Sequence, residues 1–254
     1  MFKVLRVVIL LFIFTGVALG AWRAKTQSVE WKYPLPVNIY PVNGDNSPVA
    51  AAYLRGLSVD EFKPVEAFMR DEAARYGRTS QASIEIRLGG IVDALPPAPP
   101  RNGSAPEVIW WSLKMRWWAW RNTDTVGPGP QVKMFVLYFD PAQSKILAHS
   151  TGLQKGLIGR VNVFATGSMT KQNNVVIAHE FLHTLGATDK YEPADNQPQF
   201  PDGYANPDLI PLLPQRFAEI MAGRTPLSKT AAEIPAALED TLIGGKTARE
   251  INWR

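Results

Sequence analysis

The feature that most constrains this chain is a pair of histidines, four residues apart, in the segment 173–191. The five residues from His179 to His183 read H-E-F-L-H, which matches the pattern H-E-x-x-H. On an α-helix, residues four apart lie one turn above each other on the same face, so both imidazoles can bind one metal ion. Glu180 then lies beside the open position of the metal, where its carboxylate can accept a proton from water. The pattern predicts a catalytic zinc site carried by a helix.

The residues around this motif predict the helix independently. Asn173 or Asn174 is a candidate N-cap, because a short polar side chain can accept hydrogen bonds from the free N–H groups at a helix start. Gly186 suits a left-handed residue at the helix end. The apolar positions are Val175, Ile177, Ala178, Phe181, Leu182 and Leu185. The alternative is a helix with two unrelated histidines, a coincidence expected on the order of once in several hundred chains with so few histidines.

The residues after the helix extend the motif. From His183 the chain continues T-L-G-A-T-D to Asp189, which gives H-E-x-x-H-x-x-G-x-x-D. This pattern resembles the extended signature of the metzincin zinc proteases, in the variant with a final aspartate that is typical of snapalysin-type proteases. The resemblance implies that Gly186 turns the chain sharply and that Asp189 is the third zinc ligand. A carboxylate is an acceptable ligand, but its charge is expected to make the zinc a weaker Lewis acid than a third histidine would.

A second segment adds to the resemblance. Residues 219–223 read E-I-M-A-G and resemble the methionine turn beneath the metal in metzincins, with Met221 as its methionine. Two other residues stay open as the third ligand. One is His149, the only histidine outside the motif, for which a surface or packing role is the simpler interpretation. The other is Glu219, because some related zinc proteases use a downstream glutamate.

The resemblance also implies a fold. The expected class is α+β and zincin-like, with a mixed β-sheet, an active-site helix and a smaller, loop-rich C-terminal subdomain. A single domain is expected over residues 22–254, with an upper part at about 35–186 and a lower part at about 187–254. In this architecture an edge strand lines the cleft and pairs with an extended substrate.

The expected activity is that of an exported zinc metalloendopeptidase, with Zn²⁺ as cofactor and a peptide or protein as substrate. His179, His183 and Asp189 hold the zinc, and Glu180 acts as general base towards a zinc-activated water. Two alternatives stay open: a cell-wall peptide amidase that uses the same site, and a non-catalytic zinc-binding protein of the cell envelope. Glu180 argues against the second, because a structural zinc site has no use for a base.

The N-terminal residues 1–21 have the composition of a targeting segment. Lys3 and Arg6 precede an apolar run that ends in small residues near Gly20. This order predicts a secretory signal cleaved after Gly20, or else an uncleaved membrane anchor over residues 4–21. Both interpretations predict an extracytoplasmic protein, periplasmic or secreted.

Composition narrows the choice of ligands and partners. The chain has no cysteine, which excludes disulfides, thiolate ligands and a lipid attached to an N-terminal cysteine. Hydrophobic residues make up 46% of the 254 residues, enough for a sizeable core. The net charge of +4 makes membrane or cell-envelope surfaces candidate partners, whereas no basic nucleic-acid motif is present. The oligomeric state does not follow from the sequence.

Periodicity and turn signals predict the remaining elements. Strands are expected at 37–40, 83–88, 132–139, 146–149 and 160–165. Helices are expected at 58–76, with Ser58 and Glu61 as a capping box and Gly77 as the stop, and at 236–242. The proline-rich segments 93–106 and 191–214 are expected to be loops.

Five tryptophans lie between residues 110 and 120, interspersed with Lys114, Arg116 and, just beyond, Arg121. One interpretation is an amphipathic surface that contacts a membrane interface or stacks on glycans. The other is a helix packed on the sheet, with its basic side chains reaching outward to solvent. The sequence favours the second interpretation without excluding the first.

Overall fold

A computed structural model describes residues 5–7, 11–12, 15, 26, 28–78, 83–100, 103–123, 131–154 and 156–254. The predicted signal or anchor segment lies outside this description, apart from residues 5–7, 11–12 and 15. Among the described residues, none of the helices combines the length and the apolarity needed to cross a bilayer.

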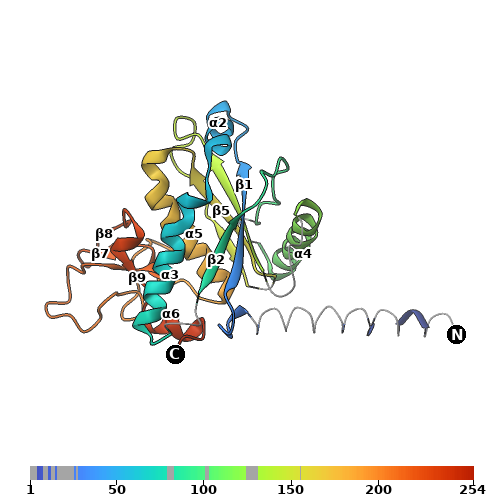
Figure 1. Cartoon of the computed structure of the whole chain (residues 1–254). Coiled ribbons are helices and arrows are strands. Elements are labelled where there is room, and N and C mark those ends of the chain that lie inside the picture. The colour runs from blue at the N-terminus through green and yellow to red at the C-terminus, as the bar shows by residue number, and fades with distance from the viewer. Residues whose placement is uncertain are drawn as a thin grey trace.

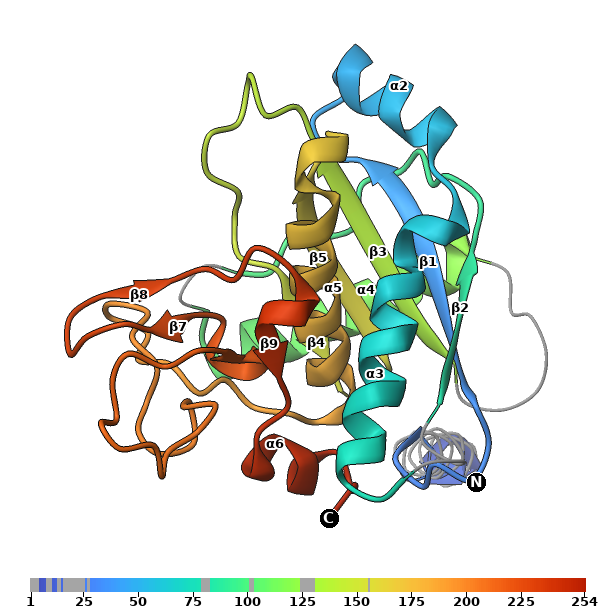
Figure 2. The same ribbon diagram turned by 60° about the vertical axis from the view of Figure 1, so that its left-hand side comes forward.

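The chain is α+β, with helices packed around a central sheet (Figure 1). The sheet is mixed and five-stranded, with strand order β2-β1-β3-β5-β4 (Figure 2). Four strands run parallel to their neighbours: β1 (Leu35–Asn43), β2 (Ile84–Leu88), β3 (Val132–Phe139) and β5 (Ile158–Phe164). The short strand β4 (Thr151–Leu153) pairs antiparallel with β5 and forms one edge of the sheet. The coarse fold class expected from the sequence is therefore confirmed.

Helices cover both faces of the sheet. Helices α2 (Pro48–Gly56), α3 (Lys63–Arg75) and α5 (Thr170–Leu185) pack on one face, and α4 (Ala105–Asn122) packs on the other (Figure 2). In the central strand β3, Met134 and Val136 point into the first core, whereas Phe135 and Leu137 point into the second. Burial on both faces explains why β3 is an almost continuous run of apolar residues.

The helix predicted at 58–76 begins later in the structure, as α3 at Lys63. Ser58 caps a 3₁₀ turn, η1 (Val59–Phe62), by accepting a hydrogen bond from the Asp60 amide at 3.2 Å. The predicted capping box is wrong, because the Glu61 carboxylate accepts from the Tyr53 hydroxyl at 2.8 Å instead. The predicted stop is confirmed, since Gly77 follows the helix with a φ of +74°.

Two further predicted elements are wrong. The segment 146–149 is not a strand, and the edge strand β4 begins only at Thr151. The segment 236–242 is not a helix: it forms the 3₁₀ turn η4 (Leu238–Asp240) followed by strand β9 (Thr241–Leu242). The C-terminal helix is α6 (Gly245–Glu250). In both cases the local apolar pattern was too short to distinguish element types.

The chain after α5 forms a region of loops and very short elements. This region contains the 3₁₀ turn η3 (Ile220–Ala222). Another 3₁₀ turn, η2 (Gly167–Met169), lies directly before α5. The short strands there are β6 (Ala218–Glu219), β7 (Thr225–Pro226), β8 (Ala232–Glu233) and β9, paired as β6–β9 and β7–β8. Residues 192–217 carry no regular element.

The tryptophan-rich segment forms α4, and its tryptophans divide between two faces. Ser104 and Glu107 form a capping box at its start. Trp111 and Trp118 are buried against the sheet, with the Trp118 ring 4.8 Å from that of Phe135. The interpretation as a packed helix is therefore confirmed for this face, while the other tryptophans of α4 face solvent.

The C-terminus closes onto the segment that precedes β1. Trp253 and Trp31 are each 1% exposed, and their ring centroids lie 5.5 Å apart. The indole N–H of Trp31 donates a hydrogen bond to the Ile251 carbonyl at 2.7 Å. This contact ties the last residues of the chain to the start of the sheet.

Replacement of Trp253 by alanine should lower the free energy of unfolding by about 3–5 kcal/mol, because it empties a large buried volume. The matched control is Trp120→Ala, in which the removed ring is 70% exposed. That control should change the free energy by less than about 0.5 kcal/mol. Urea unfolding followed by circular dichroism measures both, and equal effects would contradict the proposed closure.

Candidate metal centre

Helix α5 carries the two histidines and is held in place by buried asparagines. The predicted asparagine cap is wrong, because α5 begins at Thr170 and both asparagines lie inside it. Asn173 exchanges hydrogen bonds with the Phe164 backbone, at 2.9 Å to its carbonyl and 3.3 Å from its amide. The Asn174 side chain donates to the Glu61 carbonyl at 2.8 Å. These contacts fix the helix against the end of β5 and the turn η1.

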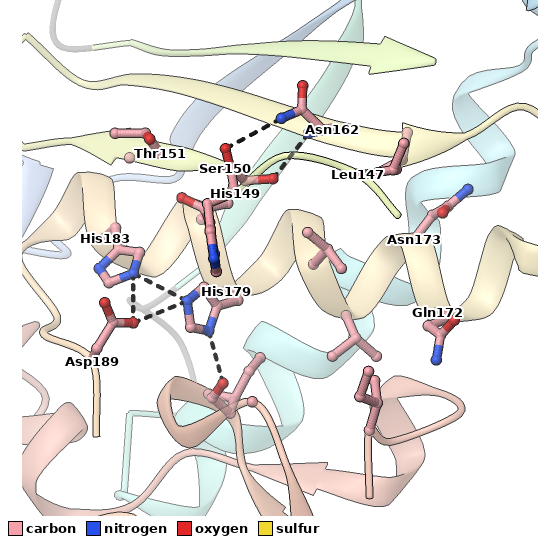
Figure 3. A pocket seen from close by; sticks show the side chains of 18 of the residues that line it. Leu147, His149, Ser150, Thr151, Asn162, Gln172, Asn173, His179, His183 and Asp189 are labelled. Atoms are coloured by element: carbon pink, nitrogen blue, oxygen red, sulfur yellow. Dashed lines mark hydrogen bonds and ion pairs between the residues drawn. The ribbon is translucent and has the colours of Figure 1, made fainter. Parts of the chain in front are cut away.

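The helix ends as the sequence predicts. Gly186 has a φ of +109°, a left-handed conformation that favours glycine, and its amide bonds back to the last turn. The chain then reverses so that Asp189 returns to the two histidines (Figure 3). The Nε2 atoms of His179 and His183 lie 3.0 Å apart, and the Asp189 Oδ1 lies 3.3 and 3.1 Å from them. The three expected ligands are thus brought together.

The far nitrogens of both imidazoles are fixed by backbone carbonyls. His179 Nδ1 lies 2.9 Å from the Ile220 carbonyl oxygen, and His183 Nδ1 lies 2.8 Å from that of Ala187. A carbonyl can only accept, so each Nδ1 carries a hydrogen and donates it. The lone pair of a neutral ring is then on Nε2, directed at the other two groups.

Three acceptor atoms therefore face one another at 3.0–3.3 Å. Such an arrangement is repulsive unless a cation, either a proton or a metal ion, lies among them. Although burial lowers the pKa of His179, its hydrogen bond to Asp189 and the charge of Glu180 raise this pKa to about 9. Burial raises the pKa of Asp189, but its hydrogen bonds to both histidines lower it well below the ordinary range. The site attracts positive charge.

Glu180 is a buried carboxylate beside this group. It is 5% exposed, and its Oε2 has no hydrogen-bond partner among the residues that the structure describes. Burial raises the pKa of Glu180, partly offset by the two histidines. One donor atom from each of His179, Glu180 and His183 lies within 4.8 Å of the others. Asp189 is nevertheless the better candidate for a third ligand, because its oxygen is within 3.3 Å of both imidazoles.

Met221 and Glu219 flank Ile220, whose carbonyl bonds to His179, but they do not join the three converging atoms. Met221 is fully buried in η3, and its carbonyl accepts from the Lys190 amide at 2.9 Å. The Glu219 Oε2 accepts from the amides of Met221 and Ala222, at 2.7 and 3.0 Å. Its Oε1 accepts from the Gly244 amide and from the Thr247 hydroxyl, at 3.0 and 2.6 Å. Both oxygens are occupied, which removes Glu219 as an alternative ligand.

The three groups open into a cleft of about 730 Å³. His149 is exposed and lies above His179 on the segment that leads into β4, apart from the three converging atoms (Figure 3). Tyr191 and Arg224 also line the cleft. Burial and the negative charges of Asp189 and Glu180 raise the pKa of Tyr191 to about 12, so its hydroxyl stays protonated at neutral pH.

The edge strand β4 lies directly on helix α5 at Gly152. A Cβ atom added at Gly152 would lie 2.4 Å from the His183 Cβ and 2.6 Å from the Glu180 carbonyl oxygen. Only glycine allows this approach, which places the edge strand beside both motif residues. No sequence pattern predicts this contact, because it depends on how β4 and α5 meet in three dimensions.

A buried ion pair holds the segment that carries Asp189. The Lys190 side chain is 1% exposed, and its Nζ lies 2.8 Å from the Glu250 carboxylate of α6. It also donates to the Thr188 carbonyl at 2.6 Å, and Glu250 accepts from the Thr188 amide at 3.0 Å. Both neighbours of Asp189 are thereby fixed to α6. Sequence reasoning missed this pair, whose members are sixty positions apart.

A scan against models of known protein families finds no match, and a search among curated proteins finds none either.

Replacement of Glu250 by glutamine should lower the free energy of unfolding by about 3 kcal/mol at neutral pH, because it leaves the Lys190 charge buried without a counter-charge. The control is Asp202→Asn, which breaks the exposed pair of Asp202 with Lys246 and should cost less than about 1 kcal/mol. Urea unfolding measures both.

The effect of Glu250 should also depend on pH. Burial raises the pKa of Glu250, but hydrogen bonds from Lys190 and Thr188 outweigh this and keep it below its ordinary value of 4.5. The stabilisation is therefore present above pH 4.5 and is lost as the pH falls through the folded-state pKa. The difference between wild type and Glu250→Gln should shrink below that pH, and a difference that grows on acidification would contradict the role of this pair.

Replacement of Gly152 by alanine should push β4 away from α5, with a cost of about 1–3 kcal/mol from overpacking. Gly90→Ala is the matched control, since a Cβ atom there meets nothing within 4 Å. Thermal unfolding of both variants measures the difference. Equal melting temperatures would show that β4 does not lie on the helix as described.

Proposed function

We propose that this chain is a zinc-dependent metalloendopeptidase of zincin-like architecture. The observation that carries the proposal is the convergence of His179 Nε2, His183 Nε2 and Asp189 Oδ1 at 3.0–3.3 Å. Supporting features are the mixed sheet, its antiparallel edge strand in contact with α5, and the loop-rich region that follows α5. Met221 is buried next to Ile220, whose carbonyl bonds to His179.

The donor set fits zinc. Two imidazoles and one carboxylate are typical zinc ligands, and catalytic zinc sites use three protein ligands and leave one position open. Ligand atoms at about 2.0–2.1 Å from a tetrahedral zinc are about 3.3 Å from one another, close to the separations in this site. A bound zinc ion would supply Lewis-acid chemistry, by lowering the pKa of a water molecule and polarising the scissile carbonyl.

Glu180 is the proposed general base. Its Oε2 is buried and unpartnered among the described residues, at the floor of the cleft beside both histidines. It would accept a proton from the attacking water at this oxygen and later transfer that proton to the leaving nitrogen of the peptide. A buried carboxylate oxygen without a hydrogen-bond partner is costly, so the retention of Glu180 supports a catalytic role over a structural one.

The cleft suggests how a peptide would be held. Strand β4 is the last strand of the sheet, and the cleft lies along it. An extended peptide can pair with such an edge through main-chain hydrogen bonds. Tyr191 lines the same cleft, and its protonated hydroxyl is a candidate donor to the oxygen of the scissile carbonyl as negative charge develops there.

Export remains part of this proposal. It is supported by the basic residues and the apolar run at the N-terminus, whether that segment is cleaved or retained.

Metal analysis tests the ligand set first. The purified chain should contain one zinc ion, and His183→Ala and Asp189→Ala should each lose most of it. His149→Ala is the control, because His149 lines the cleft without joining the three converging atoms, and it should retain the metal. Zinc that persists in Asp189→Ala would reject Asp189 as a ligand, and a chain without zinc would reject the proposal.

Peptide hydrolysis tests the catalytic role. Glu180→Gln should retain zinc but lose about 10²–10⁴-fold in rate on an unstructured protein substrate, because the general base is removed. Hydrolysis of cell-wall peptides alone, with no cleavage of proteins, would instead indicate the amidase. Full activity in Glu180→Gln, or none in the zinc-loaded wild type on either substrate, would contradict the proposed mechanism.

A further inference from the structure

The outward face of α4 is an unpartnered apolar surface. It consists of Ile109, Trp110, Leu113, Trp117 and Trp120, each between 49% and 70% exposed, and we refer to it as the outer stripe. These positions recur every three or four residues, so they line one side of the helix over three turns. The opposite side of α4 is buried on the sheet. A continuous stripe of large apolar side chains on a solvent-facing helix marks a contact surface.

Basic side chains accompany the outer stripe. The Lys114 Nζ lies 5.4 Å from the centre of the Trp110 ring, and the Arg121 guanidinium lies 5.6 Å from that of Trp117. The only acidic residue of α4 is Glu107, and its carboxylate is engaged with Ser104 in the capping box at the start of the helix. The stripe is therefore apolar along its centre and positively charged along its side.

We propose that the outer stripe docks on a lipid bilayer that contains anionic lipids. Tryptophan favours the membrane interface, where its ring is buried and its N–H stays hydrated. A helix that lies in this plane places its apolar side among the acyl chains, and lysine and arginine beside it bind the phosphates. Lys114 and Arg121 have the positions that this arrangement requires.

The place of α4 in the fold supports a lipid bilayer as the partner of the outer stripe. Val37 of β1 pairs with Val132 of β3, so both strands start at the same end of the sheet. The Lys133 side chain donates to the Thr123 hydroxyl at 2.7 Å, which puts the C-terminal end of α4 at that end as well. The chain enters β1 there, soon after the apolar run at 4–21. A membrane-inserted N-terminus would bring the same end of the domain to the bilayer.

Other occupants fit less well. The outer stripe is a convex helix ridge, whereas sugars and small ligands bind in concave sites. In a symmetric dimer the stripe would meet itself, and Lys114 and Arg121 of the two copies would be brought close together. The sheet lies between α4 and α5 (Figure 1), so docking through α4 would leave the catalytic cleft open to substrate.

A single reporter position tests the proposal in the full chain. Because the chain has no cysteine, Trp120→Cys provides one site for an environment-sensitive fluorophore. Val49→Cys on α2, which is 43% exposed on the other face of the sheet, is the matched control. Each labelled chain is mixed with vesicles of phosphatidylcholine and phosphatidylglycerol, or of phosphatidylcholine alone. The N-terminal segment is present in every sample, so retention by that segment is common to all.

The expected result is a blue shift at position 120 with the anionic vesicles and none at position 49. When Lys114→Glu and Arg121→Glu are added to the labelled chain, the concentration of anionic vesicles needed for that shift should rise at least about tenfold. The melting temperature should stay unchanged. No shift at position 120 in a chain that sediments with vesicles would overturn the proposal. It would also be overturned by an equal shift with neutral vesicles, which would exclude recognition of anionic lipid. A shift that grows with protein concentration without vesicles would indicate self-association instead.

Discussion

The hydrogen bond from His179 Nδ1 to the Ile220 carbonyl joins the two halves of the site. The histidine belongs to α5, which is packed on the sheet, whereas the carbonyl belongs to η3 in the later, loop-rich region. This contact orients one imidazole only if η3 keeps its shape. Glu219 maintains that shape, because its buried carboxylate accepts four hydrogen bonds from η3 and from the residues before and within α6. The ring orientation therefore depends on a carboxylate outside the cleft.

The same region also positions the third group. Lys190 bonds to η3 through its backbone amide and to α6 through its ammonium group. Asp189 directly precedes Lys190 in the segment that follows the end of α5. The candidate ligands thus come from a rigid helix and from a loop that is fixed on both sides. Such support is what a catalytic constellation requires, because small errors in position are costly for chemistry.

The sequence predicted the parts of the site that are local. The spacing of His179 and His183 is a property of one helix. Gly186 predicts the turn at the helix end, after which Asp189 lies next to the two histidines. The two asparagines were misassigned as caps because α5 begins earlier, at Thr170, and their side chains bond to β5 and η1 instead. The contact of Gly152 with α5 and the Lys190–Glu250 pair join segments that are distant in the sequence. No local pattern encodes them.

The elements of the fold were likewise predictable only where the local sequence pattern is strong. Strand β3 carries a long apolar run that the sequence identifies, and the predicted strands 37–40 and 160–165 locate parts of β1 and β5. Strand β4, in contrast, has three residues and no hydrophobic pattern. Helix α4 is apolar on two opposite sides, so periodicity could not say which side meets the sheet. The structure assigns Trp111 and Trp118 to the core and leaves the outer stripe in solvent.

Charge balance is the last argument that connects the site to its proposed chemistry. The cleft floor holds two carboxylates, Asp189 and Glu180, and two imidazoles whose Nδ1 hydrogens are already committed to carbonyls. With neutral rings, the buried Glu180 and the more exposed Asp189 carry two negative charges. No lysine or arginine among the described residues forms an ion pair with either carboxylate. Protons can neutralise these charges, as the raised pKa values of His179 and Glu180 indicate, but a protonated Glu180 cannot act as a base. A divalent cation would balance both carboxylates and leave Glu180 ionised, which supports the choice of a metal ion over a proton as the species that completes this site.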